Sequence, residues 1–265
     1  MTLPLPELFR SRTTESLGTS EAERLFAALD NGESPVSIRF NPYKIGSQPE
    51  GRQVPWCRYG YYLDERPQFT LDPAFHGGAY YVQEASSMFL EAIFRQIFEP
   101  DAAPRILDLC AAPGGKSSQL AAALQGQGLL VSNEYVAARA DILKSNLERM
   151  GVPNAVILNE TPARIAEALP EFFDRVLVDA PCSGEGMFRK EAVAVTQHSE
   201  ALVKQCAELG AQILDCAAAV LAPGGQLVYS TCTFAPEEDE GQVAAFLQRH
   251  PEFTLADALC FAVFY

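Results

Sequence analysis

Short apolar runs alternate with longer amphipathic segments along most of the chain after Tyr80. Such alternation is typical of a parallel sheet whose strands are connected by crossover helices. In these sheets, ligands bind beyond the carboxyl ends of the strands, where the winding reverses direction. The pattern predicts an α/β domain with helices at 86–98, 115–124, 136–150, 162–169, 199–221 and 237–249, and with strands at 105–110, 128–133, 155–159, 174–179 and 226–231.

The beginning of the chain follows a different pattern. Helical periodicity at 5–17 and 20–29 precedes an alternating strand at 36–40 and a stretch rich in proline, glycine and aromatic residues. We therefore expect two domains, a small N-terminal α+β module at 1–76 and the larger α/β domain at 77–265.

Three tyrosines of the N-terminal module, Tyr59, Tyr61 and Tyr62, stand near Arg58 and Arg66 in the sequence. Aromatic rings beside cations can stack on single-stranded bases. Aromatic residues at this density also fill the core of a small domain, and we favour the core over base stacking for these tyrosines.

The composition of the 265-residue chain, 48% hydrophobic with a formal net charge of −14, is that of a globular protein. No apolar run reaches the ~20 residues that span a bilayer, and the N-terminus has prolines and Glu7 where a signal peptide is apolar. We therefore expect a cytoplasmic protein without membrane contact. The charge disfavours a simple nucleic-acid binder but alone excludes no partner. The acidic run at 237–240 is most simply a solvent-exposed helix start.

A turn at 110–115 follows the first strand of the α/β domain and contains Pro113, Gly114 and Gly115. Glycine lets the backbone approach a ligand closely, and the next helix offers N–H groups at its positive end. The turn alone fits either a nucleotide-like cofactor or a plain strand-to-helix connection. Glu134 ends the second strand, where an acid can bind ribose hydroxyls or complement a helix dipole.

Two common nucleotide-binding motifs are missing from this turn. A Walker A loop would need glycine at Cys110, and the dinucleotide fingerprint Gly-x-Gly-x-x-Gly is absent. These exclusions favour an adenosine-type cofactor without a pyrophosphate, such as S-adenosylmethionine.

Two thiols follow strands of the predicted sheet. Asp179 and Cys182 come directly after the fourth strand, and Cys232 ends the fifth. The seven cysteines include no Cys-x-x-Cys pair, so we expect reduced thiols, no disulfide framework and no metal site. The histidines lie elsewhere in the sequence, so a Cys–His dyad has little support. Cys206 and Cys216 are spaced along a helix and are expected to be inert core residues.

Four segments in this order resemble the Nol/Nop/Sun family of RNA cytosine-C5 methyltransferases: Cys-Ala-Ala-Pro-Gly-Gly-Lys at 110–116, Asn-Glu at 133–134, the run 179–190 and the run 229–240. The Met-Phe-Arg-Lys extension at 187–190 is most similar to the bacterial 16S ribosomal RNA enzymes. Segments 37–41 and 80–84 also match the N-terminal region of the family, so the resemblance covers nearly the whole chain.

The resemblance implies a Rossmann-like class I methyltransferase sheet and S-adenosylmethionine as methyl donor. It implies that Cys232 is the nucleophile that adds to C6 of cytosine, that Cys182 assists release of the product, and that Asp179 contacts the cytosine edge. Lys190 and Arg189 are expected to meet RNA phosphate. The residues expected to hold the methyl donor are Cys110, Ala111, Ala112, Pro113, Gly114, Gly115, Lys116, Glu134, Arg139 and Asp179.

The sequence departs from the family at two places. Many members carry an aspartate after the third strand, but this chain has Asn-Glu-Thr-Pro at 159–162, which leaves the adenine contacts open. The chain also ends at Tyr265, before the family's last strand and C-terminal RNA-binding domain, so we expect a fragment.

Three other functions stay open beside methylation of ribosomal RNA by a monomeric enzyme. The substrate could be transfer RNA. The chain could be a non-catalytic RNA-binding ribosome assembly factor, although such a factor would not require both thiols, Asp179 and the glycine turn together. A methyltransferase that acts on protein or on a small molecule would not need Cys232.

Overall fold

The computed structural model describes residues 3–30, 35–44, 51–97 and 103–256. The chain forms two compact units, each considered by itself below. We call one the thiol unit, because it contains Cys182 and Cys232, and the other the sheet unit. The described residues of the thiol unit lie within 3–30, 180–215 and 229–256, and those of the sheet unit lie within 35–179 and 216–228.

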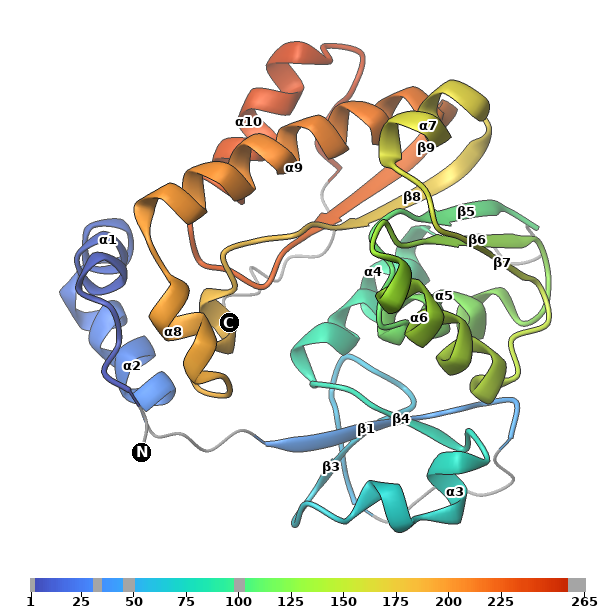
Figure 1. Ribbon diagram of the computed structural model, residues 1–265, viewed down its shortest axis with the longest axis horizontal. Helices are drawn as coiled ribbons and strands as arrows, with labels where there is room; N and C mark the ends of the chain where they lie inside the picture. The colour runs from blue at the N-terminus through green and yellow to red at the C-terminus, as the bar shows by residue number, and fades with distance from the viewer. Residues whose placement is uncertain (1–2, 31–34, 45–50, 98–102, 257–265) are drawn as a thin grey trace. The chain divides into compact units, whose positions relative to one another are not determined.

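The main sheet consists of β5 (Arg105–Asp108), β6 (Leu129–Asn133), β7 (Ala155–Leu158), β8 (Phe173–Asp179) and β9 (Leu221–Ser230). Its strand order is β7-β6-β5-β8-β9 (Figure 1). The pairs β5–β6, β5–β8 and β6–β7 are parallel. The winding reverses at β5, so the switch point where α/β proteins bind ligands lies between β5 and β8. The predicted α/β fold is confirmed.

Helices α4 (Leu90–Ile97), α5 (Gly115–Leu124) and α6 (Ala137–Met150) cover one face of this sheet (Figure 1). Helix α5 occupies the residues that the sequence predicts. Later in the chain, α7 (Pro162–Ala168) connects β7 to β8, with Thr161 as its N-cap. The helices therefore provide the crossover connections that a parallel sheet requires.

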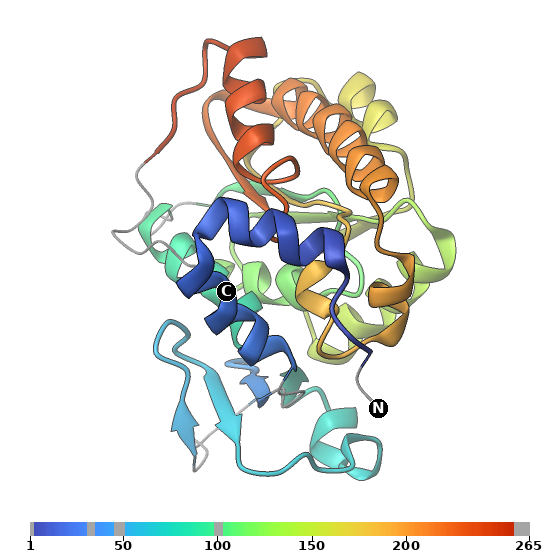
Figure 2. The ribbon, with the colours of Figure 1, turned by 90° about the vertical axis from the view of Figure 1, so that its left-hand side faces the viewer.

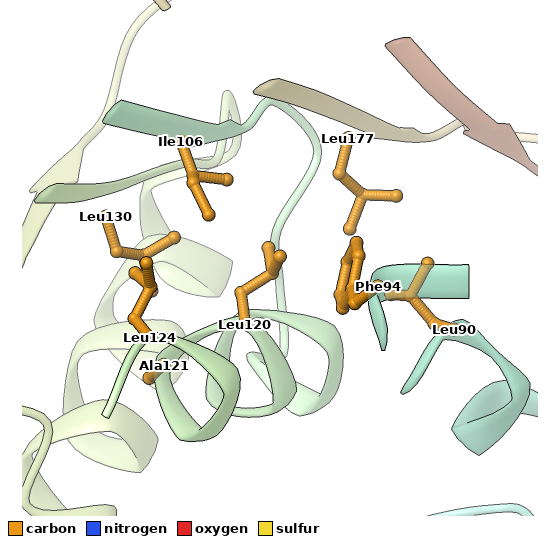
Figure 3. Packing of buried hydrophobic residues seen from close by; sticks show 8 residues of the cluster. All are labelled: Leu90, Phe94, Ile106, Leu120, Ala121, Leu124, Leu130 and Leu177. Carbon is orange, nitrogen blue, oxygen red and sulfur yellow. The ribbon is translucent and has the colours of Figure 1, made fainter. Parts of the chain in front are cut away.

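Apolar side chains fill the space between α5 and the sheet. Figure 3 shows the leucines of α5 pointing toward residues of β5, β6 and β8, with two side chains of α4 beside them. Every member of this cluster is at most 5% exposed, so each buried leucine contributes roughly 2 kcal/mol to folding. The cluster consists of Leu90, Phe94, Ile106, Leu120, Ala121, Leu124, Leu130 and Leu177.

A second, antiparallel sheet in the sheet unit has the order β2-β3-β1-β4. Its strands are β1 (Val36–Phe40), β2 (Arg52–Gln53), β3 (Gly60–Leu63) and β4 (Tyr80–Val82). The strand predicted at 36–40 is confirmed, whereas β2, β3 and β4 were not predicted. Tyr61 is buried, as expected of a core residue, but Tyr59 and Tyr62 are only half-buried.

The thiol unit contains the first two helices of the chain. Helices α1 (Glu7–Leu17) and α2 (Thr19–Asp30) form a hairpin around Gly18, which Figure 2 shows in blue. Phe9 and Phe26 of this hairpin pack against Phe188 in an apolar cluster. The unit also contains α8 (Ala192–Gln197), α9 (Glu200–Val220) as far as Asp215, and α10 (Glu240–Arg249).

The compact units divide the chain at other positions than the boundary expected between residues 76 and 77. Helices α1 and α2 belong with the thiol-bearing segments, and β4, beyond residue 76, completes the sheet that β1 begins. That residues 1–76 form an independent module stays a prediction. No helix in the described part of the chain has the length and apolar composition to cross a membrane.

Candidate active site

The turn after β5 begins at Asp108, the last residue of the strand. Asp108 is fully buried, and its Oδ2 accepts a hydrogen bond from Ser117 Oγ at 2.6 Å. Its Oδ1 has no hydrogen-bond partner among the described residues. Burial raises the pKa of Asp108 to about 7 against the opposing effect of Ser117, and the carboxylate of Asp179 adds to the increase. The buried oxygen can therefore accept a hydrogen bond from a cationic ligand group.

Sequence reasoning missed Asp108 as a site residue. The signal was present, because an acidic residue ends an otherwise apolar strand directly before a glycine turn. A charged side chain at such a position is costly to bury unless a partner or ligand compensates it.

The turn itself is held by backbone hydrogen bonds. Gly114 caps α5 in the left-handed region, with a φ of 106°, and its N–H donates to Ala111 O at 2.8 Å. Ala111 N–H donates to Asn133 O of β6, also at 2.8 Å. Only glycine adopts such a φ without strain, so the glycine at position 114 determines the path of the backbone through the turn.

Side chains from α6 and the antiparallel sheet hold the outer part of the turn. Arg139 donates to Ala112 O at 3.0 Å, and Asn146 donates to Pro113 O at 2.8 Å. Tyr81 of β4 donates its hydroxyl to the same oxygen, Pro113 O, at 3.3 Å. The turn is thus fixed from several elements of the sheet unit.

Lys116 and Asp179 form an ion pair between the first turn of α5 and the end of β8. The side chains are 15% and 35% exposed, so both are accessible at the carboxyl end of the sheet. The thiol of Cys110, in the turn after β5, is not suited to act as a nucleophile. Burial raises the pKa of its thiol to about 12, with Asp108 adding to the effect, so Cys110 stays protonated.

Glu134 lies at the end of β6 and is almost completely buried. Its Oε1 accepts a hydrogen bond from Val136 N–H at 2.9 Å, and its Oε2 lies 3.5 Å from Arg139 Nη1. The structure therefore brings together Glu134 and Arg139, two of the residues expected to hold the methyl donor. The neighbouring Tyr135 is 67% exposed beside them.

Two asparagines organise the segment where the sequence departs from the family. Asn133 exchanges hydrogen bonds with the backbone of Glu160, with both distances at 3.0 Å. Asn159 donates to the carbonyl oxygens of Glu134 and Tyr135, at 2.7 and 2.9 Å. These contacts hold the ends of β6 and β7 together, a role that sequence reasoning assigned to neither asparagine.

In the thiol unit, Cys182 and Cys232 are in contact. Their sulfur atoms lie 3.2 Å apart, and the backbone N–H of Cys232 donates to the sulfur of Cys182 at 3.3 Å. Cys182 is partly buried and Cys232 is exposed. The hydrogen bond with Cys232, together with burial, raises the pKa of the Cys182 thiol, which favours its protonated form.

The acidic run 237–240 holds the segments on which the two thiols lie. Glu238 is only 2% exposed and accepts a hydrogen bond from Ser183 N–H, next to Cys182, at 2.8 Å. Asp239 accepts a hydrogen bond from Thr231 Oγ1, next to Cys232, at 2.7 Å. The prediction of a solvent-exposed helix start was therefore wrong for Glu238. Helix α10 begins only at Glu240, three residues after the predicted start, and its N-cap Asp239 has a non-helical backbone.

The two predicted phosphate contacts follow the 3-10 turn η3 (Glu185–Met187). Lys190 is exposed and Arg189 is half-buried. Both belong to the thiol unit, together with Cys182 and Cys232, whereas the other predicted site residues belong to the sheet unit. Asp179 and Cys182 of one motif therefore fall into different units, because the division between the units passes between Asp179 and Ala180.

Comparison with known proteins agrees with the fold and with the motifs. Residues 95–262 match the family described as 16S rRNA methyltransferase RsmB/F, and residues 5–85 match the N-terminal domain of 16S rRNA methyltransferase RsmF. The parallel sheet and its glycine turn define a Rossmann-like methyltransferase. The chain belongs to the RsmB/F family of 16S rRNA methyltransferases, which confirms the resemblance.

Individual relatives show the extent of the match. Ribosomal RNA small subunit methyltransferase F of Cronobacter sakazakii is 38% identical over 263 residues, which cover 94% of this chain and 54% of that protein. The protein of the same name from Escherichia coli O139:H28 is 34% identical, with 95% and 55% covered. The crystal structure of a methyltransferase homolog from Pyrococcus horikoshii has a TM-score of 0.77 and 31% identity, covering 92% of this chain and 78% of that one. The chain spans about half the length of the curated relatives.

Proposed function

We propose that this chain methylates C5 of a cytosine in 16S ribosomal RNA, with S-adenosylmethionine as the methyl donor. The contact between the thiols of Cys182 and Cys232 carries the proposal. C5 of cytosine is a poor nucleophile, so its methylation requires a second group that adds to the ring, whereas transfer to nitrogen or oxygen does not. Membership in the RsmB/F family supports ribosomal RNA as the substrate.

The sheet unit offers residues that fit the methyl donor. The buried Oδ1 of Asp108 lacks a partner among the described residues and suits a cationic ammonium group. The turn 110–115 with the start of α5 would hold the methionine part, and Glu134, oriented by Arg139, would hold the ribose hydroxyls. When bound, S-adenosylmethionine supplies an electrophilic methyl group.

Cys232 is the proposed nucleophile. Its thiolate forms a bond to C6 of cytosine, and the electron pair of the C5–C6 double bond moves to C5, which then reacts with the methyl group. Loss of the proton at C5 and cleavage of the bond between C6 and sulfur restore the ring. The exposed position of Cys232 at the end of β9 suits attack on a base from outside.

Cys182 is proposed to assist release of the product. Its raised pKa keeps it protonated, and its sulfur lies 3.2 Å from that of Cys232. The S–H of Cys182 can therefore donate a hydrogen bond to Cys232 as that sulfur leaves carbon as a thiolate. Asp179 is proposed to contact N3 and the amino group of cytosine, while Lys116 holds its carboxylate.

The RNA is proposed to meet cations of both units. Arg189 and Lys190 would contact phosphate. In the antiparallel sheet, Arg52 lies on the exposed strand β2. Its guanidinium is 4.4 Å from the ring centre of Tyr62 on β3. An exposed cation stacked on an aromatic ring can bind an unpaired base, so this pair is a second proposed RNA contact, within the sheet unit. We further propose that the protein acts as a monomer in the cytoplasm.

Trapping on RNA that contains 5-fluorocytosine tests the proposal, because fluorine at C5 prevents the final elimination. With the methyl donor present, the wild-type chain is expected to form a covalent adduct that survives a denaturing gel. Cys232→Ala should form none. Cys182→Ala should accumulate an adduct even on ordinary RNA, since product release is impaired. An adduct from Cys232→Ala instead would reverse the roles of the two thiols.

The competing functions predict other outcomes in the same assay. A non-catalytic assembly factor would bind RNA without forming an adduct. A transfer RNA enzyme would form adducts with transfer RNA in preference to 16S fragments. Methyl transfer that persists in Cys232→Ala would indicate an acceptor other than C5.

A further inference from the structure

Glu185 is a fully buried carboxylate in the thiol unit that contacts the segment bearing Cys232. Its Oε2 accepts a hydrogen bond from the backbone N–H of Phe234 at 3.1 Å. The next residue, Gly186, donates its N–H to the carbonyl oxygen of Cys232 at 2.9 Å. Glu185 and Gly186 therefore hold the chain on both sides of Thr233, directly beside the nucleophile proposed above.

The contact at Gly186 leaves no room for a side chain. A Cβ added there would lie 2.8 Å from the carbonyl oxygen of Cys232, a separation that real Cβ atoms essentially never show. The two backbone segments approach each other this closely only because residue 186 is glycine. The position of Cys232 thus depends directly on the segment at 185–186.

The other oxygen of Glu185 is held from two further elements. Its Oε1 accepts hydrogen bonds from Arg12 of α1 and from Nε2 of His198, the latter at 2.8 Å. The side chain of His198 is fully buried, and its Nδ1 has no partner among the described residues. Because a carboxylate oxygen only accepts, Nε2 of His198 is the donor of this hydrogen bond. Arg12 then supplies the positive charge that a buried carboxylate requires.

We propose that Glu185, held by Arg12 and His198, is the positioning residue of Cys232. The inference rests on the proposed function, in which Cys232 is the nucleophile. It adds that Arg12, on helix α1 at the beginning of the chain, helps to fix the position of Cys232 through Glu185. In the described part of the chain, Arg12 and His198 bond to Glu185, Arg12 also lies 3.9 Å from Glu237, and neither contacts a sulfur atom, so both act through Glu185. Removing the Arg12 cation leaves the carboxylate buried without a counterion, which weakens its hold on Phe234 N–H.

Arg12→Gln is the test variant, and Arg10→Gln is its matched control. Arg10 lies on the same helix and forms an ion pair with Asp30 at 3.0 Å and a contact with the ring of Phe26. The substitution is therefore chemically identical on the same helix, but it removes an ion pair with an exposed acid and no contact with Glu185. Arg12→Lys retains a cation and is expected to restore both readouts described next.

Hydrogen exchange gives a readout that needs neither RNA nor methyl donor. In Arg12→Gln, the peptide that contains Cys232 and Phe234 should exchange its amides about tenfold faster than in Arg10→Gln, because a charge-assisted hydrogen bond has weakened. Peptides of the sheet unit should exchange at unchanged rates. Equal exchange at Cys232–Phe234 in both variants would overturn the proposal, whatever the enzyme does.

The rate of adduct formation gives the second readout, at saturating RNA and methyl donor. It should fall on the order of 100-fold in Arg12→Gln, the effect of a nucleophile displaced by about 1 Å, while the affinity for the methyl donor is unchanged. A purely structural role would instead lower the folded fraction and leave the rate per folded molecule unchanged, which contradicts the proposal. If the wild-type chain forms no adduct at all, the proposed function fails, and the exchange result still decides the role of Glu185.

Discussion

Replacing Asp108 with asparagine removes an ionisable group that the fold holds in an unfavourable environment. Asp108 is fully buried, and burial raises its pKa from the ordinary 3.8 to about 7. Between these two pH values, the folded chain retains a proton at Asp108 that the unfolded chain has released. The free energy of unfolding of the wild-type chain therefore falls as the pH rises through this range.

The structure sets the size of this effect. Each unit of pKa difference corresponds to about 1.4 kcal/mol, so from pH 5 to pH 8 Asp108 alone lowers the free energy of unfolding by about 3 kcal/mol. An asparagine side chain does not titrate, and the variant lacks this loss. Its buried amide adds a constant offset, which cancels when the two pH values are compared.

Urea denaturation of both proteins at pH 5 and pH 8 measures the difference. The stability of Asp108→Asn relative to the wild type should rise by about 3 kcal/mol between the two pH values. Asp141→Asn, at an exposed position on α6, is the matched control. A change below about 1 kcal/mol, within the error of such titrations, would refute the reasoning from burial.

Four further changes have defined outcomes. Leu120→Ala, in the cluster beneath the main sheet, should lower the free energy of unfolding by about 3 kcal/mol in a urea titration. Gly186→Ala should slow adduct formation on 5-fluorocytosine RNA about tenfold or more, because the added Cβ displaces Cys232. Glu134→Gln should weaken methyl-donor binding about tenfold by calorimetry, since a charged acceptor becomes neutral. Diamide should oxidise Cys182 and Cys232, whose sulfur atoms lie 3.2 Å apart, to a disulfide by taking two electrons and two protons from them. Peptide mapping should find the disulfide, and dithiothreitol should restore activity.

The elements that sequence predicts best here are those whose burial is periodic within one segment. Helix α5 lies where its glycine turn and its apolar positions place it, and β5 to β8 follow their apolar runs. Strand β9 begins at Leu221, five residues before the predicted start at 226, because its first half contains proline and glycine rather than an apolar run. Strands β3 and β4 were missed because each is short and is stabilised by pairing with β1. Ile38, for example, is opposite Tyr61 on one side and Val82 on the other, and no local pattern encodes such partners.

The candidate site divides in the same way. Motif residues such as Lys116 and Asp179 were identified from the sequence, and the structure pairs them. Glu185 lies inside a recognised motif, but its partners Arg12 and His198 come from distant parts of the chain. The charged neighbours of Glu238 in the sequence predict an exposed side chain, but Glu238 is buried. The direction in which a side chain points just before a helix begins depends on tertiary contacts, which the local sequence does not encode.

Carboxylates recur at this site because its loops have few backbone partners of their own. Cys232, which we propose attacks a cytosine, lies beyond the end of its strand β9. There the sheet no longer satisfies the backbone N–H groups, and a buried N–H without an acceptor is costly. A carboxylate accepts such a bond strongly and fixes the loop in the process. The same negative charge disfavours a nearby thiolate, so a cation beside the carboxylate is needed where the nucleophile must ionise. Arg12 supplies a cation beside Glu185, whereas burial raises the pKa of Asp239 to about 6. Among the described residues, Glu134 in the sheet unit and Glu185 and Glu238 in the thiol unit each accept a hydrogen bond from a backbone N–H of a loop.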